Sequence, residues 1–104
     1  MSYSITSKTR ATLSPIYLLS NGSADGEAYE WPGGAGVFLA EFTGGAVTLE
    51  FNGPNPDTDV WIAVGTDTTL AASGGALFYL PAGTHIRAAV AGASDVYATA
   101  KQLD

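Results

Sequence analysis

Cysteine is absent from this chain of 104 residues, which excludes disulfide bonds and thiolate metal sites. Small secreted domains are often cross-linked by disulfides, so their absence favours a protein made in the cytoplasm. Charged residues are also scarce, at 13% of the chain against a usual share of about 25%. A surface with so few charges is weakly solvated. The composition therefore predicts that part of the surface is covered by a partner or by further copies of the chain.

Long apolar runs are missing as well. The early run 16–19 is far too short for the core of a secretory signal or for a membrane span. We therefore expect neither secretion through a signal nor contact with a membrane. Helical spacing of apolar residues is equally hard to find, because glycine and proline interrupt every longer window.

Charge is unevenly distributed along the chain. Lys8 and Arg10 stand in a first segment without acidic residues, whereas all ten acidic residues lie from Asp25 onward. The acidic remainder would repel nucleic acid, which is therefore not expected as a partner. The basic segment suits an acidic protein surface, although two basic residues near a terminus can also be simply solvated.

Short runs rich in β-branched and aromatic residues predict strands between the glycines and prolines. The clearest unit is 36–52, where two alternating runs flank Gly44-Gly45, and it predicts a tight hairpin. Further strands are expected over 60–64, 76–80, 85–90 and 96–100. Strands at intervals of about 8–12 residues indicate an all-β fold, an antiparallel β-sandwich or jelly-roll-like domain.

Two segments depart from this regular spacing. Residues 1–20, interrupted by Pro15, are expected to form an extended N-terminal arm or an edge strand, and residues 21–104 a single sandwich domain. The run 60–64 is apolar on both sides, which places it in the middle of the sandwich or against another subunit. Self-association is therefore expected, with a trimer ahead of a dimer.

Catalytic and metal-binding patterns are weak. His85 is the only histidine, and no G-x-S-x-G nucleophile elbow accompanies it. Asn55, Asp57 and Asp59 have the spacing of the first ligands in a calcium loop, but Val60 and Thr66 occupy the places of its glycine and glutamate. We expect no metal and no cofactor.

Two further groups have both a functional and a structural interpretation. Glu41 and Glu50 fall on the outward sides of neighbouring predicted strands, where they could act as a hydrolytic pair or simply improve solubility. Trp31, with Tyr29, could form a platform that stacks on sugars, or it could plug one end of the core, which is the commoner fate of a tryptophan. The sequence predicts no enzyme.

A family resemblance covers about residues 29–100. It is carried by the runs Trp31-Pro32-Gly33-Gly34, 36–42, 45–51, 61–70, 80–83 and 86–90. In strand-and-turn pattern these resemble small virion proteins of tailed bacteriophages, above all head-decoration (cement) proteins. The resemblance implies a structural protein on the outside of a capsid, made in the cytoplasm of a bacterial host and bound to the major capsid protein. The alternative is a carbohydrate- or receptor-binding module of a phage fibre or tail, with Trp31, Tyr29 or Tyr79 as stacking residues.

Partner contact is predicted in the N-terminal segment. Its basic and apolar side chains offer anchors that an extended chain could lay along a neighbouring strand edge. The predicted contact residues are Tyr3, Ile5, Lys8, Arg10, Leu13, Ile16 and Tyr17.

Overall fold

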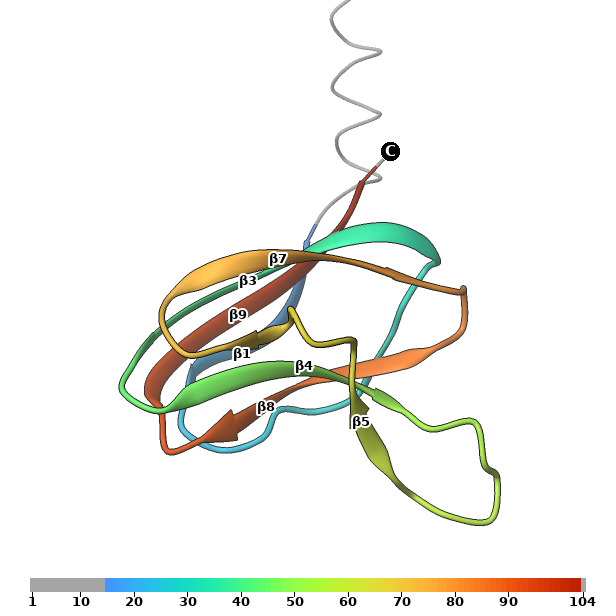
Figure 1. Ribbon diagram of the computed structural model, residues 1–104, viewed down its shortest axis with the longest axis horizontal. Helices are drawn as coiled ribbons and strands as arrows, with labels where there is room; N and C mark the ends of the chain where they lie inside the picture. The colour runs from blue at the N-terminus through green and yellow to red at the C-terminus, as the bar shows by residue number, and fades with distance from the viewer. Residues whose placement is uncertain (1–14, 104) are drawn as a thin grey trace, which may run out of the picture.

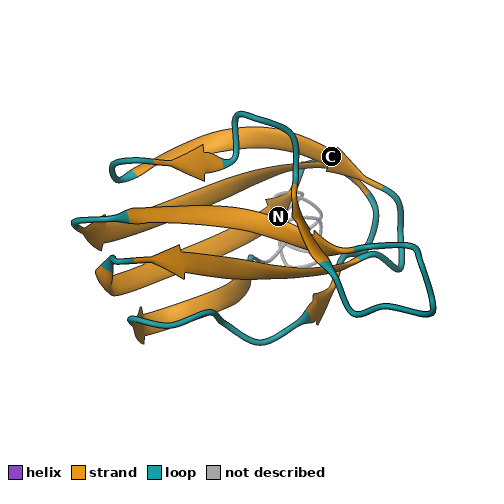
Figure 2. Cartoon of the chain, turned by 60° about the horizontal axis from the view of Figure 1, so that its bottom comes forward, coloured by secondary structure: helices purple, strands orange, loops and turns teal. Residues whose placement is uncertain are grey.

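The computed structural model describes residues 15–103, which contain nine strands and no helix (Figures 1 and 2). The strands are β1 (Ile16–Gly22), β2 (Tyr29–Glu30), β3 (Gly34–Thr43), β4 (Ala46–Asn52), β5 (Trp61–Ala63), β6 (Thr69–Leu70), β7 (Gly74–Leu80), β8 (His85–Ala91) and β9 (Ser94–Gln102). In this part of the chain, no helix is long and apolar enough to cross a membrane.

The strands form two antiparallel sheets that pack face to face. Sheet A has the order β1-β9-β3-β7, and sheet B has the order β2-β8-β4-β5, with β6 also paired to β4. Most connections pass from one sheet to the other, as the upper and lower strand groups of Figure 1 show. This is the arrangement of a jelly roll. The predicted all-β sandwich is therefore confirmed.

The predicted hairpin at Gly44-Gly45 is wrong in its pairing. Both glycines have positive φ, 67° and 58°, as a tight turn requires. However, β3 pairs with β7 and β9, whereas β4 pairs with β8, β5 and β6. The turn carries the chain from sheet A to sheet B, beside the turn that joins β8 to β9, and a Cβ on Gly45 would collide with the backbone of that second turn.

The core follows the predicted alternation of side chains. Val47 and Leu49 of β4 are fully buried, as is Phe38 of β3. On β9 the small side chains Val96, Ala98 and Ala100 face inward and are also fully buried. Small residues on this central strand of sheet A leave room for the larger residues of sheet B, so the two sheets can approach closely.

Trp31 closes one end of the core and is fully buried. Its ring centroid lies 4.8 Å from that of Phe78, with 51° between the ring planes. Its indole Nε1 donates a hydrogen bond of 3.2 Å to the carbonyl oxygen of Gly34. Gly36 lies under the indole with no room for a side chain, since an added Cβ would lie 2.5 Å from the ring. The core-plug interpretation is therefore confirmed, and Trp31 offers no surface for stacking on a sugar.

Two segments for which the sequence leaves more than one position open form strands at the edges of the sheets. Among residues 15–103, β1 pairs with β9 alone, so residues 16–22 form an edge strand of sheet A. β5 is shorter than the predicted strand over 60–64 and lies at the border of sheet B, not in the middle of the sandwich. Figure 1 shows that the loop before β5 projects away from both sheets. Val60, just before β5, and Ile62, on β5 itself, are both exposed.

Candidate interaction face

The outer side of sheet A is apolar, although nothing in the described chain packs on it. Its strands β3 and β7 carry apolar residues on both sides, so that one set fills the core and the other points away from it. Leu77 and Tyr79 keep 71% and 73% of their surface exposed, and Tyr17 keeps 65%. We call the following outward side chains the apolar face: Tyr17, Val37, Leu39, Leu77, Tyr79 and Tyr97.

Strand register arranges these side chains in rows across the sheet. The central row runs from Tyr17 on β1 through Thr99 on β9 and Leu39 on β3 to Gly75 on β7. One neighbouring row contains Tyr97 and Glu41, and the row on the other side contains Lys101, Val37 and Leu77. The face is therefore continuous across all four strands of sheet A.

A shallow hollow of about 870 Å³ opens on this face. Tyr17 and Tyr97 border it, and Gly74 and Gly75 of β7 supply part of its floor. The Leu39 side chain leans over Gly75, where an added Cβ would lie 2.5 Å from Leu39 Cδ2. The missing side chains on β7 thus flatten the face and make its centre accessible to a bulky partner.

Charge on sheet A lies on opposite sides of the central row. Within residues 15–103, its four strands contain three charged residues, Glu41, Asp95 and Lys101. Glu41 pairs in register with Tyr97, and Asp95 lies two positions before Tyr97 on β9. Lys101, in contrast, pairs with Val37. Four residues along β3 separate the two rows, which is a distance of about 13 Å. The row of Glu41 and Tyr97 is the acidic end of the face, and the row of Lys101 together with Tyr79, one row beyond it, forms its basic end.

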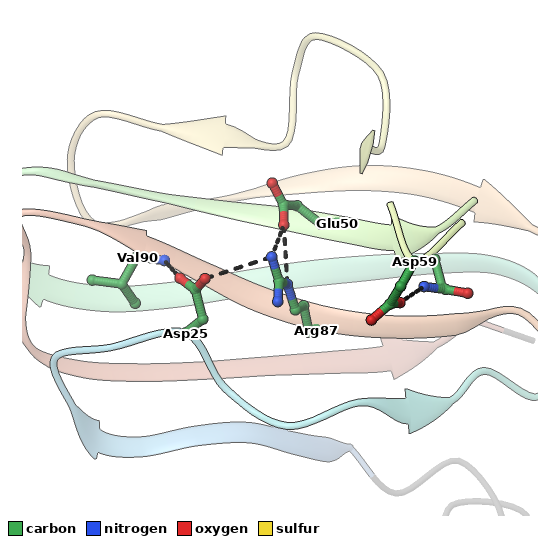
Figure 3. Close-up of polar contacts among 6 residues, drawn as sticks. Asp25, Glu50, Asp59, Arg87 and Val90 are labelled. Atoms are coloured by element: carbon green, nitrogen blue, oxygen red, sulfur yellow. Dashed lines mark hydrogen bonds and ion pairs between the residues drawn. The ribbon is translucent and has the colours of Figure 1, made fainter. Parts of the chain in front are cut away.

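The outer side of sheet B has the opposite character. Arg87 on β8 donates hydrogen bonds to Glu50 Oε1 from Nε at 3.1 Å and from Nη2 at 2.9 Å. The same Nη2 lies 3.5 Å from Asp25 Oδ2, and Asp25 Oδ1 accepts a 2.8 Å hydrogen bond from the backbone N–H of Val90 (Figure 3). These three charged groups bind one another, so Arg87 needs no partner outside the chain to neutralise its charge.

An aromatic contact completes this ionic cluster. The guanidinium carbon of Arg87 lies 4.6 Å from the centre of the Trp61 ring, a cation–π distance. Trp61 is itself partly buried. Its ring is therefore already covered by a neighbour within the chain and is a poor candidate for binding an external ligand.

Most of the sequence-predicted contact residues fall outside the described part of the chain: Tyr3, Ile5, Lys8, Arg10 and Leu13. Of the other two, Ile16 packs against the core and Tyr17 belongs to the apolar face. Sequence reasoning missed Val37, Leu39, Leu77 and Tyr97 as surface residues. For the residues of β3 and β7, the available signal is an apolar pattern on both sides of the strand, the same pattern that predicts a subunit contact for the run 60–64.

The two glutamates considered for hydrolysis do not meet. Glu41 lies on sheet A, while Glu50 lies on sheet B and is bound to Arg87. The prediction that they occupy adjacent strands is wrong, because it depended on the hairpin. Between Pro15 and Leu103, no group of three or more histidine, aspartate or glutamate side chains could hold a metal ion.

The remaining polar candidates have structural roles or unsuitable neighbours. Asn55 Oδ1 accepts a hydrogen bond from the Asp57 backbone N–H, and Asn52 Nδ2 donates one to Asp59 Oδ1, both at 2.9 Å (Figure 3 draws the second). Turn chemistry thus accounts for this loop. His85 borders a pocket of about 490 Å³, whose lining contains no serine and no carboxylate to form a catalytic triad with it.

Neither a protein-family model, nor a curated protein sequence, nor a solved structure matches the chain. The arrangement of its own residues is therefore the basis for assigning a function.

Proposed function

We propose that the chain is a structural subunit of a protein assembly, and specifically a decoration (cement) protein on the outside of a tailed-phage capsid. The observation that carries the proposal is the contrast between the two outer faces. On sheet B, Arg87 is paired with Glu50 and Asp25, whereas sheet A presents a continuous apolar face. Contiguous exposed apolar patches are often functional, and surfaces that another protein covers are among the sites they mark.

Binding rather than catalysis is the activity that such a surface supports. Jelly rolls occur in viral capsid and lectin domains, although a fold by itself does not establish a function. A decoration protein needs a rigid scaffold and a complementary contact. Each bound subunit then stabilises the assembled shell by mass action, because it binds the closed shell and not the open one.

The shell contact in this proposal comes from the N-terminal segment, with the major capsid protein as partner. The predicted contact residues Tyr3 to Leu13 precede β1 directly in the chain, and β1 is an edge strand with Tyr17 facing outward. The basic residues Lys8 and Arg10 would face acidic groups on the shell, whereas the acidic remainder would stay outside.

The direct test is made on purified virions of the phage whose genome encodes the chain. Quantitative mass spectrometry should find the chain at a fixed number of copies per shell. Recombinant full-length chain should also sediment with shells from which the native copies have been stripped. A chain that is absent from the virion and stays in the supernatant would refute the proposal.

The alternative function is a carbohydrate- or receptor-binding module of a fibre or tail. Burial of Trp31 removes one of its proposed stacking residues, but Tyr79 is exposed, and Tyr17 and Tyr97 border the hollow on sheet A. A glycan array probed with the full-length chain separates the two functions. Saturable glycan binding without shell binding would favour the alternative.

A further inference from the structure

We propose that the apolar face of sheet A is covered by the same face of a second copy, in a two-fold dimer whose axis runs across the strands. The proposal deepens the proposed function by naming one of its partners. It rests on that function only for the premise that the chain acts through protein contacts. Dimerisation is measured without any shell, so the two proposals can fail separately.

Charge complementarity is the first argument for a second copy as the occupant. The face carries Glu41 at one end and Lys101 at the other. A two-fold axis along the central row turns the second copy end for end, so that its basic end meets the acidic end of the first. Glu41 of each copy then lies against the row that contains Val37 and Lys101 of the other. The symmetry forms this contact twice.

The same charges select one orientation among the possible two-fold dimers. An axis parallel to the strands would set acidic end against acidic end and basic end against basic end, which is unfavourable. With the axis across the strands, Leu39 and Tyr17 in the central row each meet their own equivalent along the axis, Leu39 on an inner strand and Tyr17 on the edge strand. Tyr97 then lies opposite Lys101 of the second copy, within range of a cation–π contact.

The size of the face is the second argument. Four strands about 4.8 Å apart and about 23 Å long give roughly 450 Å² in projection on each copy. The side chains that project from the sheet add to this projected area. The two faces together therefore bury roughly 1,000 Å², which is the lower bound for a specific interface. We therefore expect a reversible dimer with a dissociation constant in the micromolar range. A flat sheet face admits one facing copy, so this contact favours a dimer over a trimer.

Sedimentation equilibrium of the full-length chain, from micromolar to millimolar concentration, tests the assembly. The expected result is a monomer–dimer equilibrium. Leu39→Lys places two like charges at the axis and should leave a folded monomer, since the lysine stem can still lie over Gly75. Ile62→Lys is the matched control, because it changes another half-exposed aliphatic residue on sheet B and should leave the dimer intact.

Charge reversal tests the orientation. Glu41→Lys and Lys101→Glu should each raise the dimer dissociation constant roughly tenfold, because two favourable pairs become repulsive. The double variant should restore the wild-type value, since the pairs are rebuilt with exchanged signs. The melting temperatures of the variant monomers should equal that of the wild-type monomer, because Glu41 and Lys101 are too far apart to pair within one copy.

Three outcomes would overturn the inference: a monomer at all concentrations, a dimer that survives Leu39→Lys, or single reversals that the double variant does not rescue. A monomeric chain that still binds shells would overturn the dimer and leave the proposed function standing.

Discussion

The substitution Gly36→Ala probes the way in which Trp31 closes the core. An added Cβ would lie 2.5 Å from two atoms of the Trp31 ring and 2.8 Å from Phe78 Cζ. Neither ring can move away easily, because Trp31 is fully buried and hydrogen-bonded to the Gly34 carbonyl group. One methyl group therefore has to displace two packed aromatic residues.

The magnitude follows from two opposing terms. Overpacking a well-filled core costs about 1–3 kcal/mol. Replacing glycine by alanine where the backbone allows it lowers the entropy of the unfolded chain and contributes about 0.4–1 kcal/mol of stability. We expect a net loss of about 1–2 kcal/mol, which lowers the melting temperature by roughly 5–15 °C in a domain of this size.

Gly74→Ala is the matched control, because Gly74 also lies in a strand of sheet A with φ outside the left-handed region. The nearest atom to its added Cβ is the Ala72 carbonyl oxygen, at 3.8 Å. This variant should be as stable as the wild type or slightly more stable. Thermal unfolding followed by near-ultraviolet circular dichroism measures both variants and also reports on the tryptophan environment.

A second background tests the cause of the loss. In a Trp31→Leu variant the ring atoms that face Gly36 are gone, so adding Gly36→Ala should cost less than it does in the wild type. The reasoning is wrong if Gly36→Ala melts at or above the temperature of Gly74→Ala, or if its cost is the same in both backgrounds.

Three further changes have defined outcomes. Thr68→Val removes a buried hydroxyl that donates to the Val64 carbonyl at 2.7 Å and should cost about 1 kcal/mol in urea unfolding. Thr69→Val, which removes only an exposed hydrogen bond from Thr48 Oγ1, should be nearly neutral, and equal costs would contradict this. Arg87→Ala leaves Glu50 without its cation and should cost about 1–2 kcal/mol by the same measurement, and an unchanged midpoint would show that the ionic cluster contributes nothing. Lys101→Ala, measured at a concentration where the chain is monomeric, should not change stability. Deleting residues 2–10 should leave the melting temperature nearly unchanged but weaken sedimentation with shells, and undiminished shell binding would exclude the N-terminal segment as the contact.

Local sequence patterns determined the strands and their inward sides. The alternation in β4 placed Val47 and Leu49 in the core, and the small residues of β9 were predicted on one side and are buried there. The glycine pair 44–45 was recognised as a site of positive φ. These features depend on neighbours close in the sequence, where the period of two residues and the glycine backbone act directly.

The partners of each strand were decided by the tertiary structure alone. A tight turn after β3 is compatible with a hairpin, but it also lets the chain cross to the other sheet. The choice depends on β9, β7 and β8, which pair with β3 and β4 from 30 or more residues further along the chain. For the same reason, the sequence placed Glu41 and Glu50 together and the structure separated them.

The apolar face was also beyond the reach of the sequence pattern. Where both sides of a strand are apolar, as on β3 and β7, alternation does not tell which side is buried. Phe38 and Phe78 face the core because sheet B lies on their side, and Leu39 and Leu77 are left outside. The sequence by itself determined that apolar residues line both sides of these strands, and only the packing of the two sheets decided which of them form a surface for a partner.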